Sequence, residues 1–369
     1  MHVLHVITTI NRGGAENHLF DLVRAQVGQG LVVTVAYLKG DGYWAASMRD
    51  LGVSVVSLAL ARYGDLAPLW KLRGLINGIA PDIVHAHMPP AELYSRLALL
   101  LLQPAPIMVI SKHNDERFFG GWGQRFVGKW VLRRAMRVIS ISSAVHRHVE
   151  ANLRPRPHQV VTVHYGIDPM PYRSITQEVA SGVRAGWGVP EGAHVIGTVA
   201  RFVPQKALHV LLKAYANYRA RASRDSRLVL VGRGPLEGDL KQLAVTLGIE
   251  NSVVWAGFRE DIQAVMRAFD CFALTSKYEG FGLVLLEAMA AGRAVVATAV
   301  SAIPEVVVDG VTGILCSDSD VESIAAAFSR LAEQSLQATL GEAGAHRVDK
   351  SFSIQSMAEK TVSIYLECL

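Results

Sequence analysis

The chain has 369 residues, of which 50% are hydrophobic and 19% are charged, so it can bury a large core and is expected to form two globular domains. Its net charge of +5 favours an acidic partner, such as a nucleotide phosphate, an anionic lipid or a nucleic acid. The three cysteines, Cys271, Cys316 and Cys368, lack the spacing of metal ligands, which indicates reduced packing residues.

Targeting and membrane signals are not evident. The first seven residues enter a strand directly, without the basic stretch, apolar region and cleavage site of a signal peptide, and we therefore expect a cytoplasmic protein. The longest apolar run, 97–102, is stopped by Gln103 and Pro104 before it could span a bilayer, so no transmembrane helix is expected.

Short apolar runs alternate with helical stretches, and such alternation predicts parallel sheets covered by helices on both faces. In the first half, the expected strands cover 3–7, 32–37, 53–58, 83–86, 107–111, 138–141 and 160–163. A second series covers 195–199, 228–231, 253–256, 271–275, 294–298 and 313–315. The predicted fold class is therefore α/β, with two Rossmann-like, doubly wound domains.

A connector separates the two series at 166–171, where a glycine and two prolines disfavour a helix. We accordingly place an N-terminal domain at 1–170 and a C-terminal domain at 171–351. The last segment, about 352–369, has a helical apolar pattern and can pack back onto the N-terminal domain.

Two carboxylates, Glu279 and Glu287, surround a glycine-rich turn between an expected strand and an expected helix. Gly280 and Gly282 let the backbone approach a ligand, and the amide groups of a helix start attract negative charge. A phosphate group fits such a turn.

Ordinary structural roles compete with ligand binding at this turn. Glu279 could cap the helix start, and Glu287 could be a solvated or ion-paired residue. The neighbours of Glu287 from Leu285 to Ala290 are apolar, however, so a buried carboxylate there requires a hydrogen-bonding partner, and a ligand hydroxyl would serve.

Motifs along nearly the whole chain resemble those of the GT-B fold glycosyltransferases, specifically glycosyltransferase family 4. The matching pieces are Gly13–Glu16, Asp82–His87, His113–Asn114, Tyr165–Asp168, Arg201 with Lys206, Gly232 with Gly234–Pro235, Glu279 with Glu287, and Ile303–Glu305. Each piece alone is weak, but their order and spacing together are specific.

The resemblance implies that the C-terminal domain binds a nucleotide-activated sugar and that the N-terminal domain receives the acceptor in a cleft faced by both domains. The implied donor-binding residues are Gly13, Gly14, Arg201, Lys206, Phe258, Arg259, Glu279, Gly280, Phe281, Gly282, Leu283 and Glu287. In this assignment Glu279 contacts sugar hydroxyls, Glu287 contacts the ribose, and the turn of Phe258 contacts the base.

The implied catalytic residues are Glu279, His113, Arg201 and Lys206. His113 corresponds to the family's histidine beside the transferred sugar, where it could donate to a sugar hydroxyl or support developing charge; a capping or core histidine is the competing interpretation. His87 and Asn114 are assigned to the acceptor side, and a structural role for His87 carries at least equal weight.

Retention of anomeric configuration is also implied by the resemblance. The sequence identifies no carboxylate pair suited to double displacement, so the implied mechanism is same-face attack, in which the leaving phosphate helps to deprotonate the acceptor. Arg201, Lys206 and helix-start amides would stabilise the leaving group. Because these cations can replace a divalent ion, we predict no metal and no cofactor besides the donor.

Several residues depart from the family pattern. Ala207 and Ala302 stand where glycine is frequent, Arg233 interrupts two glycines, and Arg293 replaces a common proline. These changes alter loop flexibility and local charge more than chemistry, and they leave the donor undetermined.

A stretch at 117–137 interleaves six cationic with five aromatic residues. Phe126, Trp130 and Val131 can share an apolar helix face, and the cations could meet an anionic membrane surface. An ordinary amphipathic helix packed on the sheet explains the pattern equally well. Nucleic-acid binding is disfavoured, because no recognised module accompanies the stretch.

The sequence thus predicts a retaining, metal-independent glycosyltransferase. It would move a sugar from a nucleoside-diphosphate sugar, with a UDP-sugar favoured over a GDP-sugar, to a glycan or lipid-linked acceptor in bacterial polysaccharide or glycolipid assembly, in the cytoplasm or on the inner face of the membrane. Two alternatives remain: a GT-B sugar-nucleotide epimerase or hydrolase, and a non-catalytic nucleotide-sugar-binding protein. Donor sugar, acceptor, linkage and oligomeric state are not determined.

Overall fold

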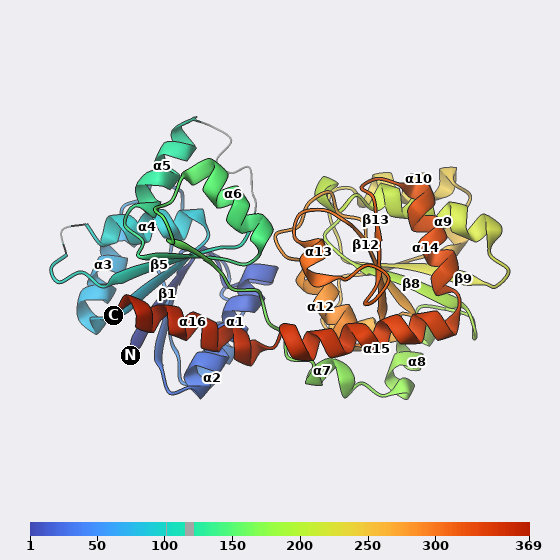
Figure 1. Ribbon diagram of the computed structural model, residues 1–369, viewed down its shortest axis with the longest axis horizontal. Helices are drawn as coiled ribbons and strands as arrows, with labels where there is room; N and C mark the ends of the chain where they lie inside the picture. The colour runs from blue at the N-terminus through green and yellow to red at the C-terminus, as the bar shows by residue number, and fades with distance from the viewer. Residues whose placement is uncertain (101, 115–121) are drawn as a thin grey trace. The chain divides into compact units, whose positions relative to one another are not determined.

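The computed structural model describes residues 1–100, 102–114 and 122–369, and it divides into two compact units (Figure 1). Unit 1 comprises Met1–Gly166 and Ile354–Leu369, and unit 2 comprises Ile167–Ser353. The boundaries expected from sequence lie a few residues away. Ile167 belongs to unit 2 because its N–H donates to the carbonyl of Phe352 and it forms a bridge with Ser353.

Unit 1 is built on a seven-stranded parallel sheet with the order β3-β2-β1-β4-β5-β6-β7. The strands are β1 (His2–Ile7), β2 (Val32–Tyr37), β3 (Ser54–Ser57), β4 (Ile83–His87), β5 (Ile107–Lys112), β6 (Arg137–Ser140) and β7 (Val160–Thr162). The strand order reverses between β1 and β4, which are neighbours although two strands separate them in the sequence. Such a reversal leaves a crevice at the carboxyl ends of the strands, where doubly wound sheets bind ligands.

Seven helices of unit 1 lie within the described residues: α1 (Gly14–Gly28), α2 (Ala45–Asp50), α3 (Ala67–Ile79), α4 (Pro89–Ala98), α5 (Trp122–Leu132), α6 (Ser143–Leu153) and α16 (Ile354–Cys368). The last helix, α16, lies beside α1 (Figure 1). Its residues Met357 and Tyr365 join Val3 and Leu22 in one buried cluster. The final segment of the chain is therefore part of the core of unit 1.

Unit 2 has a six-stranded parallel sheet with the order β10-β9-β8-β11-β12-β13. The strands are β8 (His194–Val199), β9 (Ser226–Val231), β10 (Val253–Gly257), β11 (Cys271–Leu274), β12 (Ala294–Thr298) and β13 (Ile314–Cys316). Here the order reverses between β8 and β11. The central strands are buried on both faces, which explains their nearly unbroken apolar sequences.

The helices of unit 2 are α7 (Met170–Arg173), α8 (Gln177–Gly186), α9 (Leu208–Arg221), α10 (Glu237–Thr246), α11 (Ile262–Ala268), α12 (Leu283–Ala290), α13 (Ile303–Val306), α14 (Val321–Leu331) and α15 (Gln334–Ser351). Tyr215, Tyr218 and Phe328 are fully buried in its core. The predicted doubly wound architecture is confirmed in both units, and the strand boundaries differ from the expected ones by at most two residues.

The stretch at 117–137 is only partly described, because 117–121 lie outside the described residues. In α5, Phe126 is 69% exposed whereas Val131 is 3% exposed, so the expectation that these two residues share one apolar face was wrong. They are five positions apart, and a helical turn of 3.6 residues rotates them away from each other. Trp130 lies under the guanidinium of Arg96, 4.5 Å from its ring centroid.

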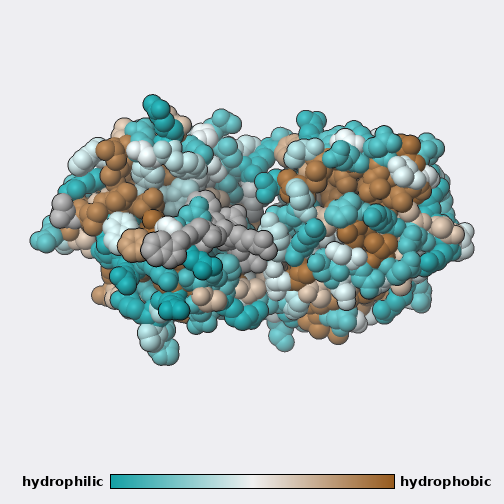
Figure 2. Space-filling model, turned by 90° about the horizontal axis from the view of Figure 1, so that it is seen from above, coloured by the Kyte–Doolittle hydropathy of each residue, from teal (hydrophilic) through white to brown (hydrophobic). Residues whose placement is uncertain are grey.

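The surface of each unit mixes hydrophilic and hydrophobic side chains, as Figure 2 shows for the face that lies uppermost in Figure 1. None of the helices among the described residues combines the length and the apolar character needed to cross a bilayer. Cys271, Cys316 and Cys368 are free and buried, in agreement with their prediction as packing residues.

Candidate functional site

The carboxyl ends of β8 and β11 carry the residues for which the sequence predicts chemistry in unit 2. Arg201 and Lys206 follow β8, and Glu279 follows β11. Because β8 and β11 are neighbouring parallel strands, their carboxyl ends lie at the same edge of the sheet. Two loops that are distant in sequence therefore meet at the point where the strand order reverses.

An ion pair joins these two loops. Lys206 Nζ lies 2.5 Å from Glu279 Oε1, and the Ser276 hydroxyl donates to the same oxygen at 2.6 Å. The side chains of Lys206 and Glu279 are only 16% and 9% exposed. A carboxylate buried to this degree needs a compensating charge, which the lysine supplies.

Backbone contacts hold the two loops together around this pair. The N–H of Lys277 donates to the carbonyl of Gln205 at 2.9 Å, and the Gln205 amide donates to the carbonyl of Tyr278 at 2.9 Å. The Thr275 hydroxyl donates to the carbonyl of Lys206 at 3.2 Å. Because both loops are anchored in this way, the ammonium group and the carboxylate are fixed relative to each other.

Helix α12 begins directly after the loop of Glu279. Gly282 caps it in the left-handed conformation, with φ of 88°, a position that strongly favours glycine. The first amides of a helix have no carbonyl partner within it, and they carry partial positive charge. Phe281 is 2% exposed and packs edge-on against Phe352, so its side chain anchors the turn and is not available to a ligand. Glu287, which is half-buried, lies farther along the helix.

Arg201 is exposed on a loop that is held in place by close backbone packing. Phe202 donates its N–H to the carbonyl of Arg233 at 2.9 Å. A Cβ atom added to Gly234 would lie 2.4 Å from the Phe202 carbonyl oxygen, and one added to Gly232 would lie 1.9 Å from that of Ala200. These two glycines are therefore required for the approach of the Arg201 loop, which accounts for the Gly-Arg-Gly sequence.

The turn after β10 was predicted to contact a base. Phe258 is 51% exposed there. Arg259 forms a fork to Asp261, with Nε at 2.8 Å and a terminal nitrogen at 2.5 Å from the carboxylate oxygens, and this contact lowers the pKa of Asp261. The charge of Arg259 is thus already paired within its own turn.

In unit 1, Gly13 and Gly14 lie at the start of α1, as the sequence predicted. Gly13 has an extended backbone, so its conformation does not itself require glycine. A Cβ atom added there would lie 2.3 Å from Oε2 of Glu16, whose other carboxylate oxygen, Oε1, accepts a hydrogen bond from the Thr9 hydroxyl. The glycine leaves room for this carboxylate at the helix start.

His87 is the last residue of β4, and His113 directly follows β5. The two buried rings are neighbours in a series of hydrogen bonds. His113 Nε2 lies 3.0 Å from His87 Nδ1, and His87 Nε2 lies 3.0 Å from His5 Nδ1. The Tyr165 hydroxyl is hydrogen-bonded to His113 Nδ1. Both ring nitrogens of His113 therefore have partners within unit 1, and contact with a ligand hydroxyl requires one partner to move.

A hollow of about 180 Å³ lies beside this series. Among the residues that line it are His113, Asn114 and Ser111, whereas His87 is fully buried behind them. Lys112 and Glu92 also line it and form a buried ion pair of 2.5 Å. Sequence reasoning missed this pair, because neither residue belongs to a motif and their pairing depends on how α4 packs on β1 and β4 of the sheet.

Comparison with known proteins identifies the family. A family model described as Glycosyltransferase Family 4 matches residues 12–170, and one described as Glycosyl transferases group 1 matches residues 183–347. The two matches cover unit 1 and unit 2 in turn. The chain belongs to this family of glycosyltransferases.

Individual relatives agree with this assignment. The glycosyltransferase is 29% identical over 311 residues to N-acetyl-alpha-D-glucosaminyl L-malate synthase of Bacillus anthracis, a match that covers 83% of this chain and 80% of the relative. It is 29% identical over 299 residues to putative glycosyltransferase EpsF of Bacillus subtilis, covering 79% and 77% of the two chains. HepE of Anabaena, in complex with UDP and glucose, matches over 100% of both chains with a TM-score of 0.86 and 23% identity. The predicted GT-B fold is confirmed.

Two groups of side chains in the glycosyltransferase have a pattern found at metal sites. His5, His85 and His87 each bring a ring nitrogen within 4.8 Å of the others, but all six of their nitrogens are hydrogen-bonded to protein groups. Asp318 and Asp320 form an Asp-x-Asp pair that was not recognised in the sequence. The Asp320 carboxylate accepts from the N–H of Ser323 at 3.0 Å and so caps α14.

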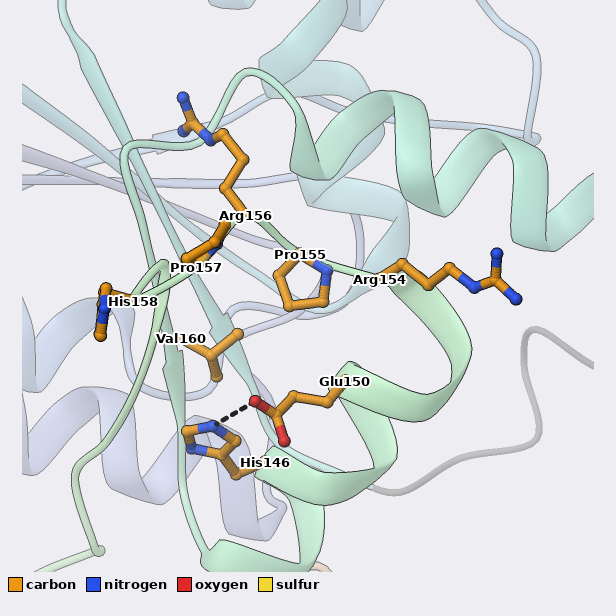
Figure 3. Close-up of a pocket in the computed structure, with 8 residues that line it drawn as sticks. All are labelled: His146, Glu150, Arg154, Pro155, Arg156, Pro157, His158 and Val160. Atoms are coloured by element: carbon orange, nitrogen blue, oxygen red, sulfur yellow. Dashed lines mark ion pairs between the residues drawn. The ribbon is translucent and has the colours of Figure 1, made fainter.

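A second hollow, of about 380 Å³, lies between the end of α6 and the segment that leads into β7 (Figure 3). His146 and Glu150 form a 3.4 Å ion pair within it, while the side chains of Arg154 and Arg156 point away from each other. It borders the amino end of β7, whereas doubly wound sheets bind ligands at the carboxyl ends of their strands. The smaller hollow beside His113 is therefore the candidate site of unit 1.

The buried histidines predict how the stability of the glycosyltransferase depends on pH. Burial lowers the pKa of His113 to about 3 and that of His5 to about 4, and it also lowers the pKa values of His18, His85 and His87. In the unfolded chain these groups bind protons below about pH 6.5. The free energy of unfolding should therefore fall as the pH drops from 6.5 towards 4, by up to about 1.4 kcal/mol per pH unit for each histidine.

Urea unfolding at a series of pH values measures this slope. His18→Phe should reduce the slope by the contribution of one histidine, because it removes a buried imidazole whose pKa is lowered. The substitution breaks no hydrogen bond of His18 Nδ1, which has no partner. His158→Asn, at an exposed position, is the control and should leave the slope unchanged. A slope that is equal in all three proteins contradicts the assignment.

Proposed function

We propose that this enzyme transfers a sugar, with retention of anomeric configuration and without a metal ion, from a nucleoside-diphosphate sugar to a hydroxyl group of a glycan or lipid-linked acceptor in bacterial polysaccharide or glycolipid assembly. The observation that carries the proposal is the buried pair of Lys206 and Glu279 immediately before α12. A cation, a carboxylate and a helix start at one edge of a doubly wound sheet suit a ligand that combines phosphate with hydroxyl groups.

The donor would bind to unit 2. The first amides of α12, together with Lys206 and the exposed Arg201, would hold the diphosphate, and Glu279 would accept hydrogen bonds from sugar hydroxyls. Glu287 would meet the ribose, and the exposed ring of Phe258 would contact the base. A UDP-sugar is the favoured donor, supported by the UDP and glucose bound to HepE of Anabaena, which has the same fold.

The chemical step would break the bond between the anomeric carbon and the phosphate oxygen while the acceptor oxygen attacks from the same face. The proton of the acceptor hydroxyl would pass to the departing phosphate, so no protein base is needed. Negative charge that develops on the nucleoside diphosphate would be stabilised by Lys206, Arg201 and the amides of α12. The Lys206 ammonium is already held rigidly by Glu279, so little reorganisation would be needed during the step.

The acceptor would bind to unit 1, in the hollow lined by His113 and Asn114. His113 would contact a sugar hydroxyl, and Gly13 and Gly14 would leave the start of α1 open to a phosphate group. His87 would act behind His113 rather than touch the acceptor, because it is fully buried.

A donor panel with candidate lipid and glycan acceptors tests the proposal. UDP-sugars and GDP-sugars are compared with and without a chelator, and the anomeric configuration of the product is determined by NMR. The expected result is a product with retained configuration, formed at the same rate with chelator. An inverted product refutes the mechanism, and loss of activity with chelator refutes metal independence.

The same panel separates the two alternative functions. An epimerase or hydrolase consumes the donor equally fast without an acceptor, and a binding protein binds the donor without turnover. The cationic and carboxylate groups fixed at one point favour an enzyme, because preorganised charge is what stabilises a transition state.

Substitution of the ion pair tests the site. Lys206→Ala and Glu279→Ala should each lower turnover by about 100-fold to 1,000-fold, since each removes a group that contacts the reacting ligand. Glu237→Gln is the matched control, because Glu237 forms an exposed pair with Lys241 on α10. Circular dichroism checks folding, and wild-type turnover in both alanine variants refutes the site assignment.

We further propose that the stretch at 117–137 contacts an anionic membrane surface. The support is the exposure of Phe126 and Val127 on α5 next to the cationic Arg125. Phe126→Ser should weaken binding to phosphatidylglycerol vesicles at least about tenfold, as expected when an aromatic side chain that would be buried in the membrane is lost. Val245→Ser, an exposed apolar position on α10, should have no effect. Equal binding of the wild type to phosphatidylcholine vesicles contradicts the proposal.

A further inference from the structure

Eight side chains of unit 1 form one continuous chain of hydrogen bonds. In order, they are Tyr165, His113, His87, His5, Gln26, Tyr365, His85 and Ser111. They come from strands β1, β4 and β5, from helices α1 and α16, and from the segments that follow β5 and β7. Ser111 at one end and His113, which is next to Tyr165 at the other end, both line the hollow of about 180 Å³.

Burial keeps the histidines of this chain neutral. Each is less than a tenth exposed, and desolvation lowers the pKa of each below its ordinary value. A neutral imidazole has one nitrogen that donates and one that accepts. When both nitrogens are hydrogen-bonded, the direction of one bond determines the direction of the other.

Gln26 sets that direction, because its amide has a donor end and an acceptor end. Its Oε1 lies 2.8 Å from His5 Nε2, and its Nε2 donates to the Tyr365 hydroxyl at 3.3 Å. His5 must therefore donate from Nε2 and accept at Nδ1. The donor to His5 Nδ1 is His87 Nε2, and the donor to His87 Nδ1 is His113 Nε2.

The direction then holds to both ends of the chain. His113 Nδ1 is left as an acceptor, and the Tyr165 hydroxyl donates to it. On the other side of Gln26, Tyr365 donates to His85 Nδ1 at 2.5 Å, and His85 Nε2 donates to the Ser111 hydroxyl at 2.7 Å. Each donor thus meets one acceptor. The opposite order requires the Gln26 amide to turn over and every proton in the chain to move.

We propose that Gln26 is a positioning residue that acts through His5 and His87 to fix His113 in one tautomer, with its proton on Nε2 and with Nδ1 as a hydrogen-bond acceptor. This role rests on the proposed function, and it fixes which partner donates and which accepts in the hydrogen bond between His113 and the ligand. A ligand hydroxyl would replace the Tyr165 hydroxyl and donate to Nδ1. His113 would accept from the sugar, contrary to the donor role that the sequence suggested.

The tautomers can be read directly by NMR of the full-length protein with ¹⁵N-labelled histidine, because protonated and unprotonated ring nitrogens have distinct ¹⁵N shifts. In the wild type, His5, His87 and His113 should all carry the proton on Nε2. A proton on Nδ1 of His113, or a charged ring at pH 7, overturns the proposal. This measurement needs no substrate, so it is independent of whether the proposed function is correct.

Two substitutions of Gln26 separate positioning from mere packing. Gln26→Glu keeps an acceptor facing His5 and should preserve the Nε2–H form of His113, whereas Gln26→Leu removes the acceptor and should give both tautomers. With an active donor and acceptor pair, turnover in Gln26→Leu should fall by the fraction of His113 that has left the Nε2–H form, and Gln26→Glu should restore it. An unchanged His113 tautomer in Gln26→Leu overturns the proposal.

Addition of Zn²⁺ to the wild type provides a further test. The hydrogen bonds already occupy every ring nitrogen of His5, His85 and His87, so one equivalent of Zn²⁺ should leave their ¹⁵N shifts unchanged. Stoichiometric binding that shifts the signals of all three histidines would show that the cluster is a metal centre, and the proposal would fall.

Discussion

The site in unit 2 depends on the pairing of β8 with β11 as neighbouring parallel strands. Lys206 and Glu279 are 73 positions apart in the sequence, and they meet because both follow strands that end at the same edge of the sheet. The reversal of strand order at this point leaves the edge uncovered by a crossover helix. The loops can therefore pair with each other through Gln205, Lys277 and Tyr278, and the ion pair forms as a result.

The two units stabilise buried polar groups in different ways. In unit 2, the Glu279 carboxylate is paired with the Lys206 ammonium group and accepts a hydrogen bond from the Ser276 hydroxyl. In unit 1, desolvation keeps the imidazoles neutral, and they satisfy one another in a series that needs no counter-charge. A ligand phosphate at α12 would meet a cation that is already shared with Glu279, whereas a ligand hydroxyl at His113 would meet a neutral nitrogen of defined polarity.

Close backbone packing explains where the loops of unit 2 keep the glycines of the family pattern and where they depart from it. Gly232 and Gly234 are required because the segment of Phe202 approaches them within the space of a side chain. Ala207, by contrast, stands where the family often has glycine, and it adopts a left-handed conformation with φ of 45°. Its Cβ is accommodated in the core of unit 2, so burial compensates for the backbone strain of a non-glycine residue.

The sequence alone predicted the architecture and named the residues of the candidate site. The alternation of apolar runs with helical stretches predicted parallel sheets covered by helices, and the order of the motifs predicted the family. It also predicted that Glu279 and Glu287 lie on the two sides of a glycine-rich turn between a strand and a helix, where the structure has them. These are local properties, which depend on residues close together in the chain.

Only the tertiary structure decided which side chains are partners. No pattern in the sequence links Lys206 to Glu279, Lys112 to Glu92, or Gln26 to Tyr365, because these contacts depend on strand order and helix packing. The exposure of Phe126 likewise depends on which face of α5 packs against the rest of unit 1. For His113, the sequence did not distinguish between the two neutral tautomers of the imidazole. The proposed tautomer follows from the hydrogen-bonded series that joins residues of α1 and α16 to residues of three strands.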